Sequence, residues 1–263
     1  IFKDVAIGDG ISIVYKNVNK TSPGFKYVYR RNGLSITIDM DPPGEELISL
    51  NPEDGIIVDK VTQFVKDNGL SYVHDRVLPR TLFGIESNFV EEHPDEVRLF
   101  SENEPIDYSK EIKLLTNDKA GKAGKATWYI ANRDIISNNA DMISEWQVVV
   151  SSANAGGQKR NNQIEIIDNH SAFGRSRVAL GSFGTKEEAE NFYNYSCTKL
   201  IRFMYLMTDE SLTSLAKKVP DLMDYTSENS IVDFSVDLNK QLYELVGLND
   251  EEIKYVESTI LYK

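Results

Sequence analysis

The stretch that decides the fold is Gly181 to Leu222, GSFGTKEEAENFYNYSCTKLIRFMYLMTDESLTSLAKKVPDL. A turn, GSFG, leads into Thr185, which is a good N-cap residue, and Glu188 three positions later completes a capping box. Apolar residues then recur close to the 3.6-residue period of an α-helix as far as Met207. The stretch therefore predicts one long core helix that begins at Thr185.

Two cations, Lys199 and Arg202, interrupt this otherwise aromatic and aliphatic helix. They can be solvated, they can contact phosphate, or they can form ion pairs with the acidic end of the chain. From Asp221 to Lys263 there are three lysines against ten acidic residues, a net charge of 3 − 10 = −7. The pattern alone leaves these interpretations open.

The bulk composition is that of an ordinary globular protein, with 263 residues of which 41% are hydrophobic and 27% charged. No run of about 18 consecutive apolar residues occurs, so we expect no segment that spans a membrane. No signal peptide is visible, and the single cysteine, Cys197, excludes an intrachain disulfide. These features favour a reducing, cytoplasmic setting.

Charge is unevenly distributed along the chain. The total of 29 Lys and Arg against 41 Asp and Glu gives −12, which makes the whole chain a poor candidate for binding nucleic acid. Between Lys119 and Leu180, however, eight basic and five acidic residues give 8 − 5 = +3. This locally basic middle is compatible with a nucleic-acid-binding face, and equally with chance.

In the rest of the chain, the residue pattern predicts mainly strands before residue 180 and helices after it. Extended or strand patterns occur at 11–15, 25–30, 34–38, 72–77, 97–100, 112–115, 128–130, 144–151, 163–167 and 172–180. One long helix is expected near 52–68, and Asp237 and Asn249 each begin a C-terminal helix, the first of which ends at Gly247. We therefore expect an α+β protein with a strand-rich region of mixed or antiparallel sheets at 1–180. A helical part at 181–263 follows it, either as a second domain or as one continuous domain.

Several loops combine residue types that suit DNA binding. The loop KAGKAGK at 119–125 is either a solvated tip or a clamp on phosphates. Arginine pairs favourably with guanine, and asparagine or glutamine with adenine, although most polar loops contact only solvent. The candidate DNA contacts are Arg80, Lys119, Lys122, Lys125, Lys159, Arg160, Asn161, Asn162, Gln163, Arg175, Arg177, Lys199 and Arg202.

No motif for catalysis or metal binding is apparent. The three histidines have no zinc-ligand spacing, and no nucleophile motif of the Gly-x-Ser-x-Gly type is present. The tetrapeptide Asp41-Pro42-Pro43-Gly44 lacks the aromatic fourth residue with which amino-group DNA methyltransferases stack on a flipped base. We therefore predict no catalytic residue and no metal site.

A set of short segments extends in order across nearly the whole chain: Ile1–Val5 with Gly8–Ser12, Leu78–Arg80 with Phe83–Phe89, Trp146–Val150, Phe183–Phe203, Val219–Asp221, and Asp237–Tyr243 with Gly247–Ile253. In this order they resemble the C-terminal region of adenine-specific DNA methyltransferases of type II restriction–modification systems, including combined restriction–methylation enzymes. The chain departs from that pattern at Ile13–Tyr15, where an aromatic pair is preferred.

The resemblance implies a target-recognition domain that follows a catalytic domain and binds double-stranded DNA. It implies no cofactor in this part of the chain. The resemblance places S-adenosylmethionine, and Mg²⁺ as a further candidate cofactor, in a longer parent protein. The upstream methyltransferase domain of that parent chain would be a partner of this part. A start at Ile1 within a strand-like pattern suggests a fragment of such a parent, with or without endonuclease activity. The alternative is a protein-interaction module that docks a subunit of a restriction–modification complex.

Overall fold

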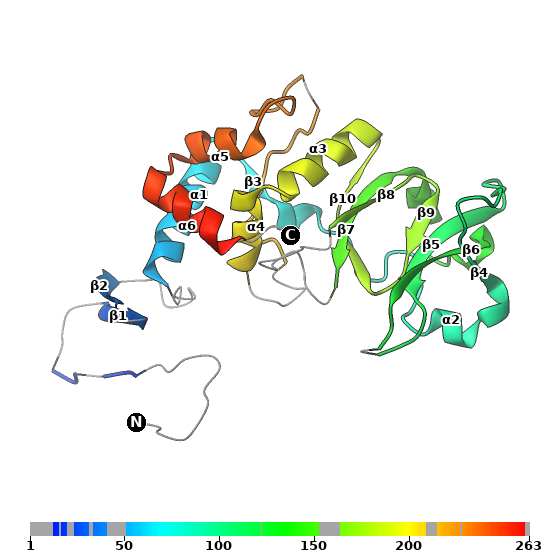
Figure 1. Ribbon diagram of the computed structural model, residues 1–263, viewed down its shortest axis with the longest axis horizontal. Helices are drawn as coiled ribbons and strands as arrows, with labels where there is room; N and C mark the ends of the chain where they lie inside the picture. The colour runs from blue at the N-terminus through cyan, green and yellow to red at the C-terminus, as the bar shows by residue number, and fades with distance from the viewer. Residues whose placement is uncertain are drawn as a thin grey trace. The chain divides into compact units, whose positions relative to one another are not determined.

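The computed structural model of the chain describes residues 13–15, 17–19, 24–31, 34–40, 51–121, 123–152, 164–208, 215–226 and 228–260 (Figure 1). The chain divides into two compact units, Ile1–Pro52 and Glu53–Lys263. The predicted α+β class is confirmed, because strands dominate the N-terminal two-thirds and helices the C-terminal part. Among the described helices, none has both the length and the apolarity needed to cross a membrane.

The first unit contains an antiparallel hairpin of β1 (Phe25–Arg31) and β2 (Leu34–Met40). In its register Phe25 lies opposite Met40 and Arg31 lies opposite Leu34. The two strands were predicted, with an Asn-Gly turn of the kind that favours hairpins between them. The third strand expected at 11–15 is absent from its described residues, 13–15, which are exposed and have no regular structure.

Two larger sheets form the strand-rich part of the second unit. The first has the antiparallel order β10-β7-β8, and the second has the order β4-β6-β5-β9, in which only β5 and β9 run parallel. A short ladder also joins β3 (Ser71–Tyr72) to β11 (Pro220–Asp221). The strands of the two larger sheets are β4 (Val97–Leu99), β5 (Glu111–Asn117), β6 (Ala126–Asn132), β7 (Trp146–Ser151), β8 (Glu165–Ile167), β9 (Ser171–Phe173) and β10 (Arg177–Phe183).

Strand β7 is buried on both faces and separates two hydrophobic cores. Val148 and Val150 belong to the core that contains the helices, whereas Val149 belongs to the core beneath the β4-β6-β5-β9 sheet. All three side chains are 0% exposed. Successive side chains of a strand point to opposite faces, so a continuous valine run fills both cores. In Figure 1, β7 and β10 accordingly lie between the helices and the second sheet.

The helices of the second unit begin and end largely where the sequence predicts. The side chain of Asp237 accepts hydrogen bonds from two backbone amides, Gly247 adopts φ 70°, and Asn249 forms a capping box with Glu252. The α-helices are α1 (Pro52–Asp67), α2 (Phe89–Glu92), α3 (Lys186–Ser196), α4 (Lys199–Leu206), α5 (Leu238–Val246) and α6 (Asp250–Thr259). Short 3-10 turns are η1 (Val73–Arg76), η2 (Pro94–Glu96), η3 (Arg133–Ile135) and η4 (Ala140–Ser144). The prediction of an extended segment at 72–77 is therefore wrong beyond Tyr72, because the next residues form the 3-10 turn η1.

The stretch from Gly181 to Leu222 contains two helices, α3 and α4, so the prediction of a single long helix was wrong. Thr198 adopts an extended conformation with φ −63° and ψ 153°, and its hydroxyl donates to the carbonyl oxygen of Tyr195 at 2.8 Å. The amide of Lys199 then donates to the side chain of Asn239 at 2.8 Å, which caps the second helix from 40 positions away. A periodicity of apolar residues cannot reveal this break, because the residue that stabilises it is distant in sequence.

Strands and helices on either side of residue 180 share one unit. Strand β10 itself runs across that position, and α3 packs on β7, β8 and β10. Along the chain, the boundary between the two compact units falls between Pro52 and Glu53.

The capping box of α3 supports a test of helix stability. The Thr185 hydroxyl accepts from the amide of Glu188 at 3.2 Å, and the Glu188 carboxylate accepts from the Thr185 amide at 3.2 Å. We expect Thr185→Ala to lower the free energy of unfolding, measured in urea, by about 1 kcal/mol, because the Glu188 amide loses its side-chain acceptor. The control Lys186→Ala removes only an exposed ion pair with Glu190 and should change it by less than about 0.5 kcal/mol. Equal effects of the two variants would contradict this account.

Candidate nucleic-acid interface

Five of the candidate DNA contacts lie at one end of the two larger sheets. Strands β5 and β9 run parallel, with Leu115 opposite Phe173, so the loops that follow them emerge at the same end. Strand β10 begins there too, with Arg177 opposite Ser151, the last residue of β7. Figure 1 shows the loop between β5 and β6 extending at this end. We call this surface the basic strand end and define it by Arg80, Lys119, Lys125, Arg175 and Arg177.

Arg80 and Arg175 lie in direct contact although 95 positions separate them. Arg80 Nε donates to the carbonyl oxygen of Arg175 at 3.3 Å, and the Arg175 guanidinium pairs with Glu86 at 2.7 Å. The amide of Arg175 also donates to the carbonyl oxygen of Ile85 at 2.9 Å. The Arg175 side chain is 42% exposed, so its backbone is fixed while its guanidinium faces solvent.

Gly174 explains why the β9–β10 loop approaches β5 so closely. A Cβ atom at this position would lie 2.3 Å from the hydroxyl oxygen of Thr116. The Gly174 amide donates to the carbonyl oxygen of Leu115 at 2.9 Å, which continues the parallel ladder by one bond. The glycine thereby sets the position of Arg175 beside the end of β5.

Arg177 is more enclosed than the other cations of the basic strand end. Its guanidinium pairs with Glu165 at 2.8 Å, and its side chain is only 12% exposed. This pair joins β10 to β8 across the sheet that they share with β7. Arg177 therefore offers a ligand less surface than Arg175 does, and its pair with Glu165 also holds the sheet together.

The loop between β5 and β6 presents Lys119 and Lys125, both exposed. The amide of Lys125 donates to Asp118 at 2.7 Å, and the amide of Ala120 donates to Glu91 at 2.6 Å. These two bonds fix the loop backbone while leaving both ammonium groups on the surface. Lys122, the third lysine of this loop, lies outside the described residues.

The amide-rich candidates Lys159, Arg160, Asn161, Asn162 and Gln163 also lie outside the described residues. The described residues on either side of this segment, Ser152 and Ile164, lie at the basic strand end. The Ser152 amide donates to the carbonyl oxygen of Ser176 at 2.9 Å, and Ile164 directly precedes β8.

Lys199 and Arg202 belong to a different part of the unit. Lys199 Nζ pairs with Glu257 of α6 at 3.2 Å, which is the ion pair with the acidic tail that the sequence left open. Arg202 is 3% exposed and lies on α4 within the core that contains the helices. The structure therefore does not bring these two cations together with the basic strand end.

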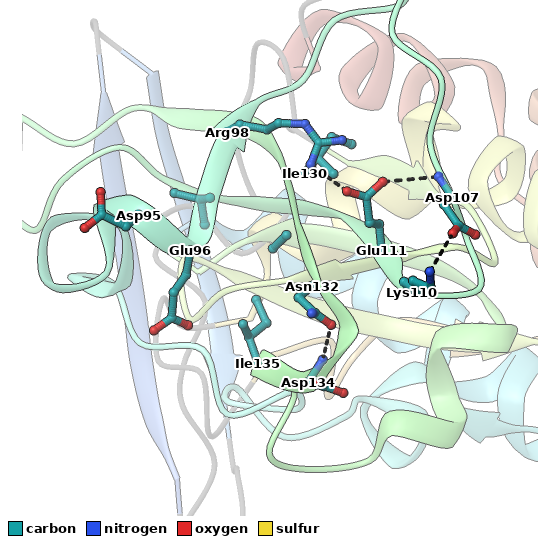
Figure 2. Close-up of a pocket in the computed structure, with 12 residues that line it drawn as sticks. Asp95, Glu96, Arg98, Asp107, Lys110, Glu111, Ile130, Asn132, Asp134 and Ile135 are labelled. Carbon is teal, nitrogen blue, oxygen red and sulfur yellow. Dashed lines mark hydrogen bonds and ion pairs between the residues drawn. The ribbon is translucent and has the colours of Figure 1, made fainter.

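A separate hollow of about 680 Å³ lies beside β4 and β6 (Figure 2). Five carboxylates line it against two cations: Asp95, Glu96, Asp107, Glu111 and Asp134 against Arg98 and Lys110. Arg98 pairs with Glu104 at 2.6 Å and with Glu111 at 2.7 Å, and this contact lowers the pKa of Glu111. An acidic lining disfavours phosphate. In the part of the chain that the structure describes, no group of three or more His, Cys, Asp or Glu side chains is arranged to hold a metal ion.

The acidic partners of the basic strand end could not be identified from the sequence. Glu86 and Glu165 pair with arginines 89 and 12 positions away, and Glu91 accepts a hydrogen bond from the lysine loop 29 positions away. No local pattern marks these contacts, since each depends on the folded arrangement of separate loops.

No protein-family model matches this chain, and no curated protein sequence matches it significantly. The resemblance to the recognition regions of adenine methyltransferases therefore stays a prediction from the segments that carry it.

Proposed function

We propose that this chain is a sequence-specific DNA recognition domain of a type II restriction–modification adenine DNA methyltransferase and is not catalytic on its own. The observation that carries the proposal is the basic strand end. Three separate segments of the chain contribute cations to it, and Arg80 contacts Arg175 across 95 positions. A cytoplasmic setting, an upstream methyltransferase domain and its S-adenosylmethionine are parts of the same proposal.

The exposed cations of this surface suit two different tasks. Lys119 and Lys125 are compact charges on a loop, and they would neutralise phosphates and release counterions. Arg175 presents a planar guanidinium that can bind the O6 and N7 atoms of guanine together. In the free protein, Glu86 forms an ion pair with the Arg175 guanidinium. This pair would hold the guanidinium in position until a base edge accepts a hydrogen bond from one of its N–H groups.

The acidic character of the rest of the chain restricts how DNA can approach. With a net charge of −12, most of the protein surface repels a phosphate backbone. The basic strand end then supplies the local attraction for the phosphate backbone. Its charge therefore orients the DNA on the protein more than it raises the affinity. Base contacts from this surface would supply the specificity.

The test is the salt dependence of duplex binding by the full chain, measured by fluorescence anisotropy on a pool of random-sequence duplexes. We expect Lys119→Ala/Lys125→Ala to lower the steepness of log K against log salt by about 2, because two phosphate contacts are lost. The matched control Lys186→Ala/Lys240→Ala removes the same charge from exposed positions on α3 and α5 and should leave the slope unchanged.

Two results would oppose the proposal. A chain with no salt-dependent affinity for duplex DNA would favour the alternative of a subunit-docking module. Equal losses in the lysine-loop variant and in the control would remove the basic strand end from the interface and leave only an effect of net charge.

A further inference from the structure

The hairpin of the first unit is a positively charged element in an acidic chain. Residues 25–40 contain Lys26, Arg30 and Arg31 against Asp39, a net charge of 3 − 1 = +2, whereas the whole chain carries −12. Arg30 and Arg31 are adjacent in the sequence and are the last two residues of β1. At the opposite end, Lys26 lies opposite Asp39 in the strand register. By strand register, two of the three cations therefore belong to the end of the ribbon at which Arg31 lies opposite Leu34, which we call the turn end.

The two faces of the ribbon differ in chemistry and in exposure. Lys26, Val28 and Arg30 alternate along β1 and are all exposed, with Val28 opposite Thr37 and Arg30 opposite Ser35. Thr37 and Ser35 are exposed as well. The intervening residues Tyr27, Tyr29 and Ile36 are half-buried. Cations, hydroxyls and Val28 thus share one exposed face, and aromatic and aliphatic side chains occupy the other, where Phe25 is 37% exposed.

We infer that the β1–β2 ribbon is a second DNA-contacting element, which enters the major groove of a duplex with its turn end first. This inference rests on the proposed function and assigns a surface that the basic strand end does not include. The major groove is about 12 Å wide and admits a two-stranded ribbon. The concentration of positive charge at the turn end complements the phosphates on both sides of the groove.

The exposed face carries the groups that base edges require. Arg30 can bind the O6 and N7 atoms of guanine together, and the hydroxyls of Ser35 and Thr37 can donate to or accept from any base edge. Val28 is 46% exposed and offers an apolar surface to the methyl group of thymine. Lys26, farther from the turn, is suited to a phosphate. A face that presents cations and hydroxyls fits a duplex groove better than a protein partner, because the cores of protein interfaces are depleted in charged residues.

The experiment uses the full chain and a duplex selected from a random pool, with dimethyl sulfate as a probe of guanine N7 in the major groove. We expect the wild-type chain to protect at least one guanine that Arg30→Ala leaves reactive, together with a loss of affinity of about 5-fold to 150-fold. Arg30→Lys keeps the charge but loses the paired contact, so it should keep the salt slope and lose the protection. Lys26→Ala/Arg30→Ala should lower the salt slope by about 1, because Lys26 supplies the phosphate contact and Arg30 the base contact.

The outcomes separate this inference from the proposed function. If Lys119→Ala/Lys125→Ala weakens binding while all three ribbon variants bind and protect as the wild type does, the ribbon inference is overturned and the proposed function stands. If guanine protection persists in Arg30→Ala and Arg30→Lys, the ribbon does not read the major groove. A wild-type chain without affinity for duplex DNA would overturn both.

Discussion

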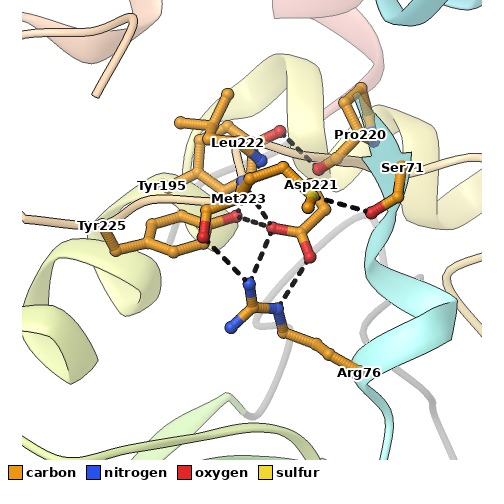
Figure 3. Close-up of polar contacts among 8 residues, drawn as sticks. All are labelled: Ser71, Arg76, Tyr195, Pro220, Asp221, Leu222, Met223 and Tyr225. Carbon is orange, nitrogen blue, oxygen red and sulfur yellow. Dashed lines mark hydrogen bonds and ion pairs between the residues drawn. The ribbon is translucent and has the colours of Figure 1, made fainter. Parts of the chain in front are cut away.

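Replacing Asp221 with alanine is expected to lower the free energy of unfolding by about 3 to 5 kcal/mol, the usual result of removing one partner of a buried ion pair. The Asp221 side chain is only 4% exposed. Its carboxylate accepts from Arg76 Nε at 2.7 Å, from the Tyr225 hydroxyl at 3.0 Å and from the Met223 amide at 2.9 Å (Figure 3). The substitution would leave all of these donors without their acceptor.

The surroundings of Arg76 explain why the loss should be large. Its guanidinium lies 5.5 Å, 5.9 Å and 5.3 Å from the ring centroids of Phe183, Phe192 and Tyr225. Aromatic faces attract a cation, but they cannot replace the charge of a carboxylate. The pair also joins η1 to β11, segments 145 positions apart. Without Asp221, a largely buried charge would remain among aromatic rings.

Urea unfolding of Asp221→Ala and Glu104→Ala gives a matched comparison. Glu104 pairs with Arg98 at 2.6 Å, but both side chains are about two-fifths exposed, at 38% and 41%. Exposed pairs contribute about 0 to 1 kcal/mol, so Glu104→Ala should change stability little. A loss below about 1 kcal/mol for Asp221→Ala would show that this site tolerates an unpaired arginine.

Raising the pH above 10 is expected to destabilise the second unit steeply. Tyr195, Tyr205 and Tyr225 are 0%, 1% and 2% exposed, and burial raises the pKa of all three phenols. In the unfolded chain tyrosine loses its proton near pH 10. The folded state retains these protons at higher pH, so the unfolded state binds fewer. Their contribution to stability is therefore complete below about pH 10 and is lost as the pH rises toward the folded pKa values.

The three tyrosines together set the size of this effect. Once the unfolded tyrosines are ionised, three protons at about 1.4 kcal/mol each per pH unit give a slope near 4 kcal/mol per pH unit. Urea unfolding at a series of pH values from about 9 to 11, with tyrosinate absorbance recorded in parallel, measures the slope. Tyr205→Phe is the control, because the Tyr205 hydroxyl makes no hydrogen bond of standard geometry within the described residues. It should reduce the slope by about one-third. A stability that does not change above pH 10 would contradict the role of these phenols.

Local chemistry was enough to predict many element boundaries. Thr185 with Glu188, and Asn249 with Glu252, are capping boxes that need only three residues of context. The valine run of β7 predicted a strand without showing that it is buried or which cores its two faces fill. These features depend either on side chains that cap the helix to which they belong, or on the alternation of side chains between the two faces of a single strand.

Contacts between distant segments could not be predicted in this way. The break after Cys197 depends on Asn239, and the buried pair of Arg76 with Asp221 joins residues 145 positions apart. The cations of the candidate interface were selected by residue type and loop context. Their grouping required the parallel pairing of β5 with β9, which no periodicity in either strand indicates.

The sharing of β7 between two cores has a consequence for how this protein can be divided or recombined. Excising the helices after residue 180 would cut through β10 and expose the valines that face them, and removing the second sheet would expose Val149. Neither half retains a closed interior without the other. The smallest transplantable piece is therefore the whole of Glu53–Lys263.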